Sequence, residues 1–547
     1  MGRASKVLLY RAAMVNRGAN GQRRAARWWT WDALWFIGLC LICLVPVWRQ
    51  QYFASTDGPS HVYNATAIAR YFSTECSVYR EYYAFNLFPV PNWAGHAVIA
   101  LFATVAAPAV AEKLFLTLYV ILLPVAMRYA VAARSPDNRY APLLIFPFIH
   151  GTALLAGWYN FSISLVVWLF ALGFWLRHGK GGKSLAPTLA LLFLLLYLSH
   201  PVSLGACVLA LGLLGLWPMV RDRRRDPAAG AGGHVKPLLT MLLCAAPFLL
   251  LVVLFALRNN PLEGQTAGNF GPSSRWHVFQ VYAMNSAMGP LSIRESLLTT
   301  AFGLFLWSLF AATLRPRAIR LDPGRHGLLA LVVVLVMLSF LVPDRFGGGG
   351  NLGRRLAILA WLAVLTWVGT HDFGRAGRGL IRFVAVAATV TQVGMRAPVL
   401  AEVEKYHEGV VEAGSIAGPN AAIVPLAAHE AAFPNPHYIP ILVRESGAYL
   451  AAGRCLVDMT NYEGQVGSFP LVTRDGLPRV HRASGDVAGA LRPPAAPWIL
   501  LSEYPAQITP ALRPVVDRAV EMVAAAYDLV GTTHRGGIHR LYRRRAP

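Results

Sequence analysis

Apolar stretches follow one another along most of this chain, and few charged side chains interrupt them. A helix that crosses a bilayer needs roughly 20 predominantly apolar residues. Hydrophobic residues make up 55% of the sequence and charged residues 14%, whereas soluble domains carry about 25% charged residues. The sequence therefore predicts a polytopic α-helical membrane protein with about eleven transmembrane helices, and argues against a soluble enzyme, a disordered chain or a disulfide-rich secreted module. The predicted spans are residues 29–47, 112–131, 141–157, 159–176, 185–199, 202–219, 236–257, 297–314, 327–343, 355–370 and 379–397.

Basic residues outnumber acidic ones by 50 to 27, which gives a net charge of +23. They gather in residues 1–28 and between the apolar stretches, a pattern that marks cytoplasmic loops of membrane proteins. No signal-peptide cleavage site follows residues 1–28, which are predicted to form a basic cytoplasmic N-terminus. Because the charge follows topology, no nucleic acid is expected as a partner. The other clusters expected inside are Arg177, Lys180 and Lys183; Arg221 and Arg223 to Arg225; Arg315, Arg317, Arg320 and Arg325; and Arg375, Arg378 and Arg382.

Residues 93–107 are apolar enough to form a helix, but counting them as a full span would place every later basic cluster outside. They are therefore predicted to form a juxtamembrane or re-entrant helix on the outer face. The membrane domain then covers residues 29–399, and the predicted outer loops are residues 48–111, 258–296 and 344–354.

The apolar content falls after residue 400, and residues 400–547 are predicted to form a small extracytoplasmic α/β domain. Short strand-like runs and one amphipathic helical pattern support this prediction. The runs are residues 421–426, 438–443 and 498–501, followed by the helix over about 510–528 and a terminal hairpin.

The six cysteines contain no metal-binding spacing. Four of them lie in apolar spans and are expected to be small core residues. Cys76 and Cys455 both fall in segments predicted to lie outside, where a disulfide between them is possible.

Asp57 is an acidic residue just after the first span, within the stretch STDGPSHVYN over residues 55–64. Gly58 and Pro59 favour a turn that starts a helix, which places His61 and Asn64 near one face. A carboxylate at the mouth of the membrane domain can act as a general base or hold a divalent cation. The same residues also fit a helix cap beside a buried structural histidine.

Other outer-face residues are candidates for substrate contacts. Arginines that follow a glycine run at a helix start can bind a phosphate, although they can also contact lipid headgroups. The remaining candidates also fit an aromatic belt or a structural helix end. The candidates, with Asn64 of the first loop included, are Asn64, Tyr159, Asn160, His200, Arg354, Arg355, Trp276 and His277.

An N-terminal span, a long first outer loop with an early Asp, a juxtamembrane helix and an outer C-terminal domain resemble the GT-C superfamily of membrane glycosyltransferases. The stretches TDGPSHVYNA and GWYNFSISL also resemble segments of bacterial polytopic proteins of this kind. The resemblance implies transfer of a sugar from a polyprenyl-phosphate carrier to a glycan, lipid or protein acceptor at the outer face of the cytoplasmic membrane.

The resemblance further implies that Asp57 is the general base and that Arg354 or Arg355 lies near the carrier phosphate. Many members carry a second acid, but Gly58 follows Asp57 here and the second outer loop offers no acid. This departure makes His61 the candidate partner of Asp57 and leaves a divalent cation as an alternative. Two other functions stay open, a lipid-linked glycan transporter or flippase and a non-enzymatic subunit of a polysaccharide assembly or export machine.

Overall fold

The computed structural model describes residues 31–225, 232–259, 272–314, 325–345, 349–427, 439–477, 496–505 and 513–545, with a few single residues between 478 and 512. Several predictions fall wholly or partly elsewhere. The basic residues 1–28, Arg315 to Arg320 and parts of the loops 258–296 and 344–354 lie outside the described residues.

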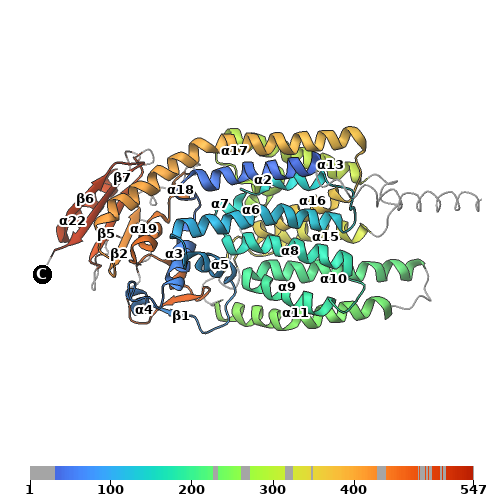
Figure 1. Cartoon of the computed structure of the whole chain (residues 1–547), viewed down its shortest axis with the longest axis horizontal. Helices are drawn as coiled ribbons and strands as arrows, with labels where there is room; N and C mark the ends of the chain where they lie inside the picture. Colours follow the sequence, from blue (N-terminus) through green and yellow to red (C-terminus); the bar gives the residue numbers. More distant parts are fainter. Residues whose placement is uncertain are drawn as a thin grey trace, which may run out of the picture.

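Long apolar helices lie side by side in one bundle (Figure 1). Eight of the described helices are long and apolar enough to cross a membrane, so this is a multi-pass membrane protein. They are α2 (Trp31–Arg49), α6 (Pro108–Ala132), α8 (Tyr159–His178), α10 (Pro201–Arg225), α11 (Gly232–Asn259), α13 (Ile293–Thr313), α16 (Leu352–Gly369) and α17 (Gly374–Ala413).

The remaining predicted spans are shorter elements of the same bundle. They are η1 (Ala141–Phe148) with α7 (Thr152–Leu155), α9 (Leu185–Ser199) and α15 (His326–Leu341). A continuous α-helix over 141–157 is the wrong prediction among them, because η1 is a 3-10 helix that contains Pro147. Proline cannot donate the backbone hydrogen bond that an α-helix needs at that position. Helical structure occurs at every predicted span.

The basic clusters that the structure describes gather at one end of the bundle, here called the basic end. Asp32 at the start of α2 forms an ion pair with Arg382 of α17 at 2.6 Å. Arg177 at the end of α8 donates a hydrogen bond to the carbonyl of Tyr129 near the end of α6. At the other end of α6, the Lys113 ammonium lies 5.7 Å from the ring of Trp48. The antiparallel arrangement predicted for the first two spans is thus present.

The opposite end, here called the loop end, holds the first loop and the C-terminal domain (Figure 1). The loop contains α3 (Gly58–Ala69), α4 (Val78–Tyr82), β1 (Tyr83–Phe85) and α5 (Ala94–Ala103). At ten residues, α5 rises only about 15 Å, too short for a full span. It packs against α3, α6 and α8, as a helix at the end of the bundle should. Between α11 and α13 lie α12 (Pro272–Ala283) and η3 (Ser286–Met288).

The C-terminal part forms the predicted α/β domain around a five-stranded sheet. The strand order is β3 (Val457–Asp458), β2 (Ala422–Ala427), β5 (Trp498–Glu503), β7 (Ile538–Arg544) and β6 (Tyr527–Thr533). The first three strands are parallel, and β7 joins antiparallel to both β5 and β6. The helices are η5 (Gly414–Ile416), α18 (Ile439–Leu442), α19 (Ser446–Arg454), α20 (Tyr462–Gln465) and α22 (Arg513–Ala526), and a further strand is β4 (Leu471–Thr473).

The strands predicted over 421–426 and 498–501 are confirmed as β2 and β5. The terminal hairpin is confirmed as β6 and β7, and the amphipathic helix as α22. The strand predicted over 438–443 is wrong, because α18 occupies this segment. Pro440 in its middle lacks the amide hydrogen that a paired strand requires.

The predicted division at residue 400 falls inside a helix. At 40 residues, α17 is about 60 Å long and runs from the basic end to the C-terminal sheet (Figure 1). First-loop residues such as Val62 and Tyr63 share one buried core with Ile423, Leu450 and Leu500 of the C-terminal domain. The loop and the domain therefore form one packed unit on top of the bundle.

A covalent link strengthens this unit. Cys76 before α4 and Cys455 after α19 form a disulfide, as the sequence analysis allowed. β1 also pairs antiparallel with β4, with Ala84 opposite Val472. The first loop and the C-terminal domain are therefore joined covalently as well as through their shared core.

We expect oxidised wild-type protein to change its mobility on denaturing gels when it is reduced. A Cys455→Ser variant should run like reduced protein under both conditions, whereas Cys244→Ser, which changes a free cysteine, should behave like wild type. Loss of a disulfide that closes so long a loop typically costs about 2–5 kcal/mol of stability, so Cys455→Ser should also lower the Tm. An oxidised sample without a reduction-dependent shift would contradict the assignment.

Candidate active site

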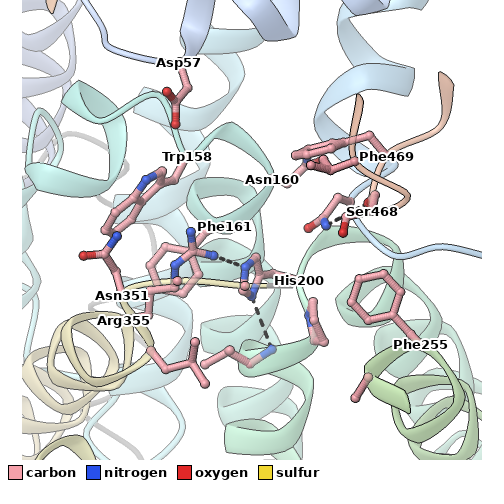
Figure 2. Close-up of a pocket in the computed structure, with 18 of the residues that line it drawn as sticks. Asp57, Trp158, Asn160, Phe161, His200, Phe255, Asn351, Arg355, Ser468 and Phe469 are labelled. Atoms are coloured by element: carbon pink, nitrogen blue, oxygen red, sulfur yellow. Dashed lines mark hydrogen bonds between the residues drawn. The ribbon is translucent and has the colours of Figure 1, made fainter. Parts of the chain in front are cut away.

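A cavity of about 450 Å³ lies between the helix ends at the loop end and the segments of the C-terminal domain that cover them. The predicted site residues Asp57, Asn160, His200 and Arg355 line it (Figure 2). His61 is a fifth predicted residue that lines it. The other lining residues include Asn92, Trp158, Phe161, Val252, Phe255, Ala256, Asn351, Tyr462, Ser468 and Phe469.

Asp57 is held at the top of this cavity by backbone contacts with the turn before α8. The Thr56 and Asp57 amides donate to the carbonyls of Leu155 and Ala156, at 2.9 and 3.2 Å. Asp57 precedes the first residue of α3, but its side chain makes no capping hydrogen bond. Its carboxylate instead points towards the cavity (Figure 2), so the interpretation of Asp57 as a side-chain cap is not supported.

Two glycines make this close approach possible. Gly157 adopts a left-handed backbone with φ of 73°, and a Cβ there would lie 2.4 Å from the amide nitrogen of Gly58. A Cβ on Gly58 would lie 2.0 Å from the Ser55 hydroxyl. The two stretches TDGPSHVYNA and GWYNFSISL therefore meet backbone to backbone, and their contact fixes the position of Asp57.

Arg355, in the first turn of α16, faces the cavity from another side. Its guanidinium lies 4.5 Å from the centroid of the Trp158 ring and 5.2 Å from that of Phe161, in contact with Nε2 of His200. Asn351, with a left-handed φ of 58°, leads into the helix. A helix N-terminus beside a guanidinium attracts an anion through its free amides and its dipole.

Burial and the Arg355 guanidinium hold the pKa of His200 well below its ordinary value. The His200 ring is therefore neutral at neutral pH, and the positive charge stays on Arg355. Below this pair, Val252, Phe255 and Ala256 of α11 give the cavity an apolar wall. The cavity thus combines a carboxylate, a cation and an apolar surface.

His61 belongs to a buried cluster with His96 of α5 and Glu463 of α20. The two carboxylate oxygens of Glu463 lie 2.7 Å from Nδ1 of His61 and 2.7 Å from Nε2 of His96. Burial alone would raise the pKa of Glu463, but the two histidines lower it to about 2. Burial likewise opposes the charged form of His61, and Glu463 raises the pKa of His61 above its ordinary value.

Two predicted site residues lie behind the cavity instead of lining it. Asn64 donates to the Ser60 carbonyl and to Oδ1 of Asn461, each at 2.9 Å. The Tyr159 hydroxyl donates to the buried carboxylate of Glu112. Their prediction as substrate contacts is corrected to a supporting role, because helical periodicity turns both side chains into the protein core.

Three further predicted residues lie away from the cavity. Trp276 is 54% exposed and stacks on Phe279 of its own helix, α12, and His277 is also exposed. Arg354 interacts electrostatically with His277 and with Asp344. Successive residues of a helix differ in direction by about 100°, so Arg355 faces the cavity and Arg354 does not.

Sequence reasoning missed His96 and Glu463. His96 is an isolated imidazole on a short apolar helix, a pattern that indicates topology and not chemistry. Glu463 lies 367 residues from His96 in the chain, so no local spacing could connect them. The one signal in the sequence for this cluster was a lone histidine in each of two neighbouring helical segments, His61 and His96.

The fold and this cavity define a multi-pass α-helical membrane protein whose C-terminal α/β domain closes a polar pocket at one end of the bundle. No protein-family model and no curated protein matches the sequence. Two solved structures are similar to it, both crystal structures of ArnT from Cupriavidus metallidurans. The structure bound to undecaprenyl phosphate is 12% identical, with coverage of 94% of this chain and 98% of that chain and a TM-score of 0.45. The apo structure is 11% identical, with coverage of 94% and 97% and a TM-score of 0.47.

Proposed function

We propose that this protein is a membrane glycosyltransferase of the GT-C kind, which moves a sugar from a polyprenyl-phosphate carrier to an envelope acceptor. The observation that carries the proposal is that Asp57 and Arg355 line one cavity from different elements. A sugar transfer from a phosphate carrier needs a base for the acceptor and a cation for the leaving group.

In the proposed reaction, an acceptor hydroxyl attacks the anomeric carbon of the carrier-bound sugar. The bond between that carbon and the phosphate oxygen breaks, and polyprenyl phosphate leaves with the electron pair. Asp57 takes the proton of the attacking hydroxyl, and Arg355 with the N-terminus of α16 stabilises the charge on the departing phosphate. The apolar wall formed by Val252 and Phe255 suits the first isoprenoid units of the carrier.

The donor set around Asp57 does not favour a hard divalent cation there. Among the described residues that line the cavity, Asp57 is the single carboxylate, whereas such cations prefer several oxygen ligands. We therefore assign Asp57 the role of base without a metal.

We further propose that the protein sits in the cytoplasmic membrane with its N-terminus inside and its C-terminal domain outside. The basic clusters at the end opposite the cavity support this orientation, as does the disulfide at the loop end. The cavity would then open at the outer face, where lipid-linked sugars and envelope acceptors meet.

The positions of the ionic side chains bear on the alternative function, a transporter or flippase. Transporters place ionisable groups near the middle of the membrane. In the described spans, the buried ionic side chains Glu112, Glu295 and Arg396 and the half-buried Arg355 lie near the loop end. Arg396 pairs with Glu295 there at 2.5 Å. This distribution supports chemistry at the surface over a path through the bundle.

The test is an envelope-glycan profile of cells that lack the gene, with and without the wild-type gene restored. We expect one glycan unit to disappear and to return, and that unit identifies the sugar. Purified protein should then transfer this sugar from its undecaprenyl-phosphate carrier to the acceptor. An unchanged profile together with no transfer from any tested lipid-linked sugar would contradict the proposal.

A further inference from the structure

His61, His96 and Glu463 converge from three separate elements behind the cavity. Nδ1 of His61 lies 3.2 Å from Nε2 of His96, and each nitrogen lies 2.7 Å from a different oxygen of the Glu463 carboxylate. The side chain of His61 is 6% exposed, and those of His96 and Glu463 are fully buried. Four potential ligand atoms thus surround one point that solvent barely reaches.

The other nitrogen of the His96 ring is already used. Nδ1 lies 3.0 Å from the carbonyl oxygen of Asn92, which can only accept. The amide nitrogen of Asn160 is further away, at 3.3 Å. Nδ1 therefore carries the hydrogen, and Nε2 of a neutral His96 presents its lone pair to the cluster.

His61 is oriented in the same way. Its ring donates to the backbone carbonyl of Gly157, and Nδ1 faces the cluster. A neutral His61 therefore presents a second lone pair there. Backbone carbonyls that hold the outer nitrogens of two histidines are the arrangement that orients imidazole ligands of metal ions.

These lone pairs and the carboxylate repel one another unless positive charge lies between them. One proton on His61 would still leave the lone pair of His96 facing the carboxylate. Protons on both rings would direct two N–H groups at each other across 3.2 Å in a buried site. One divalent cation in place of the two protons satisfies both nitrogens and the carboxylate.

The ligand chemistry selects the ion. Two imidazoles and one carboxylate suit zinc and related transition metals, not magnesium or calcium. For tetrahedral bonds of about 2.0–2.1 Å, two ligand atoms lie about 3.3 Å apart, close to the observed distance between the nitrogens. The N···O distances would open by roughly 0.6 Å to admit the ion.

We propose that His61, His96 and Glu463 bind one zinc-class divalent ion that fastens the C-terminal domain to the first loop beside the cavity. The ion would hold α20 against α3 and α5, and with it the neighbouring lining residue Tyr462. Because His61 also lines the cavity, the ion would lie beside the cavity. This inference does not depend on the proposed glycosyl transfer.

The test measures metal content in full-length protein purified in detergent without chelator. We expect about one zinc per chain in wild type, and at least a tenfold lower content in Glu463→Gln and in His96→Gln. The matched control is Glu445→Gln, which changes a buried carboxylate bonded to Ser60 at 2.8 Å and should keep the metal.

A second measurement applies to wild type alone and covers variants that fail to fold. A strong chelator should lower the Tm of wild type, and added zinc, but not magnesium, should restore it. Metal-free wild type from zinc-supplemented cells, or equal zinc content in all variants, would overturn the proposal. A Tm that neither chelator nor zinc changes would do the same.

Discussion

Replacement of Asp57 by Asn is expected to lower the rate of sugar transfer by about 10²–10⁴-fold, the range for loss of a general base. Asn keeps the size of the side chain, and the backbone bonds that hold this turn involve no Asp57 side-chain atom. The amount of protein in the membrane should therefore stay unchanged. The measurement is the initial transfer rate in membranes with matched protein levels, together with restoration of the missing glycan in cells.

Asp344→Asn is the matched control, because Asp344 is another acid near the start of α16 that does not line the cavity. It should transfer sugar at close to the wild-type rate. If Asp57→Asn restores the glycan as well as wild type does, Asp57 is not the base. A transporter or an assembly subunit would then account better for the phenotype.

Replacement of Arg355 by Gln is expected to raise the KM for the lipid-linked donor by about 10–100-fold, because hydrogen bonds to charged groups contribute about 1.5–3 kcal/mol. The variant also removes the stacking of the guanidinium on Trp158 and Phe161. The measurement is the dependence of the transfer rate on donor concentration, with acceptor in excess.

The adjacent Arg354→Gln serves as the control for this change. It removes the same charge from the same turn of α16, but Arg354 does not line the cavity. Donor dependence should shift strongly for Arg355→Gln and little for Arg354→Gln. Equal shifts in the two variants would indicate a general effect of charge at the membrane surface instead of a phosphate site.

The periodic apolar stretches and the basic clusters were enough to predict the helical bundle, because they report burial and topology over short distances in sequence. The α/β character of the C-terminal part followed from its short strand-like runs. The extension of α17 beyond residue 400 could not be predicted. The segment after Pro398 is polar, and a polar segment that follows a predicted span resembles a loop.

Only part of the candidate site could be predicted, because position in the sequence is visible but side-chain direction is not. Asp57, His200 and Arg355 lie at or shortly after the ends of predicted spans, where a polar residue is a candidate for a site at the membrane surface. Side-chain direction decided the rest: Tyr159 turns inward to Glu112, whereas its neighbour Asn160 faces the cavity. His96 and Glu463 meet only through the packing of the C-terminal domain on the first loop, a long-range contact that a single sequence does not encode locally.

The shared core of the first loop and the C-terminal domain has a consequence for biogenesis. Tyr462, Ser468 and Phe469 complete a cavity whose acid, Asp57, is synthesised some 400 residues earlier. The segment with Asp57 is therefore synthesised long before the segment with Tyr462, Ser468 and Phe469. The residues of α3 that pack on the C-terminal domain have no such partner until translation is nearly finished. A chain that ended before residue 462 would lack these three lining residues and could not complete the cavity.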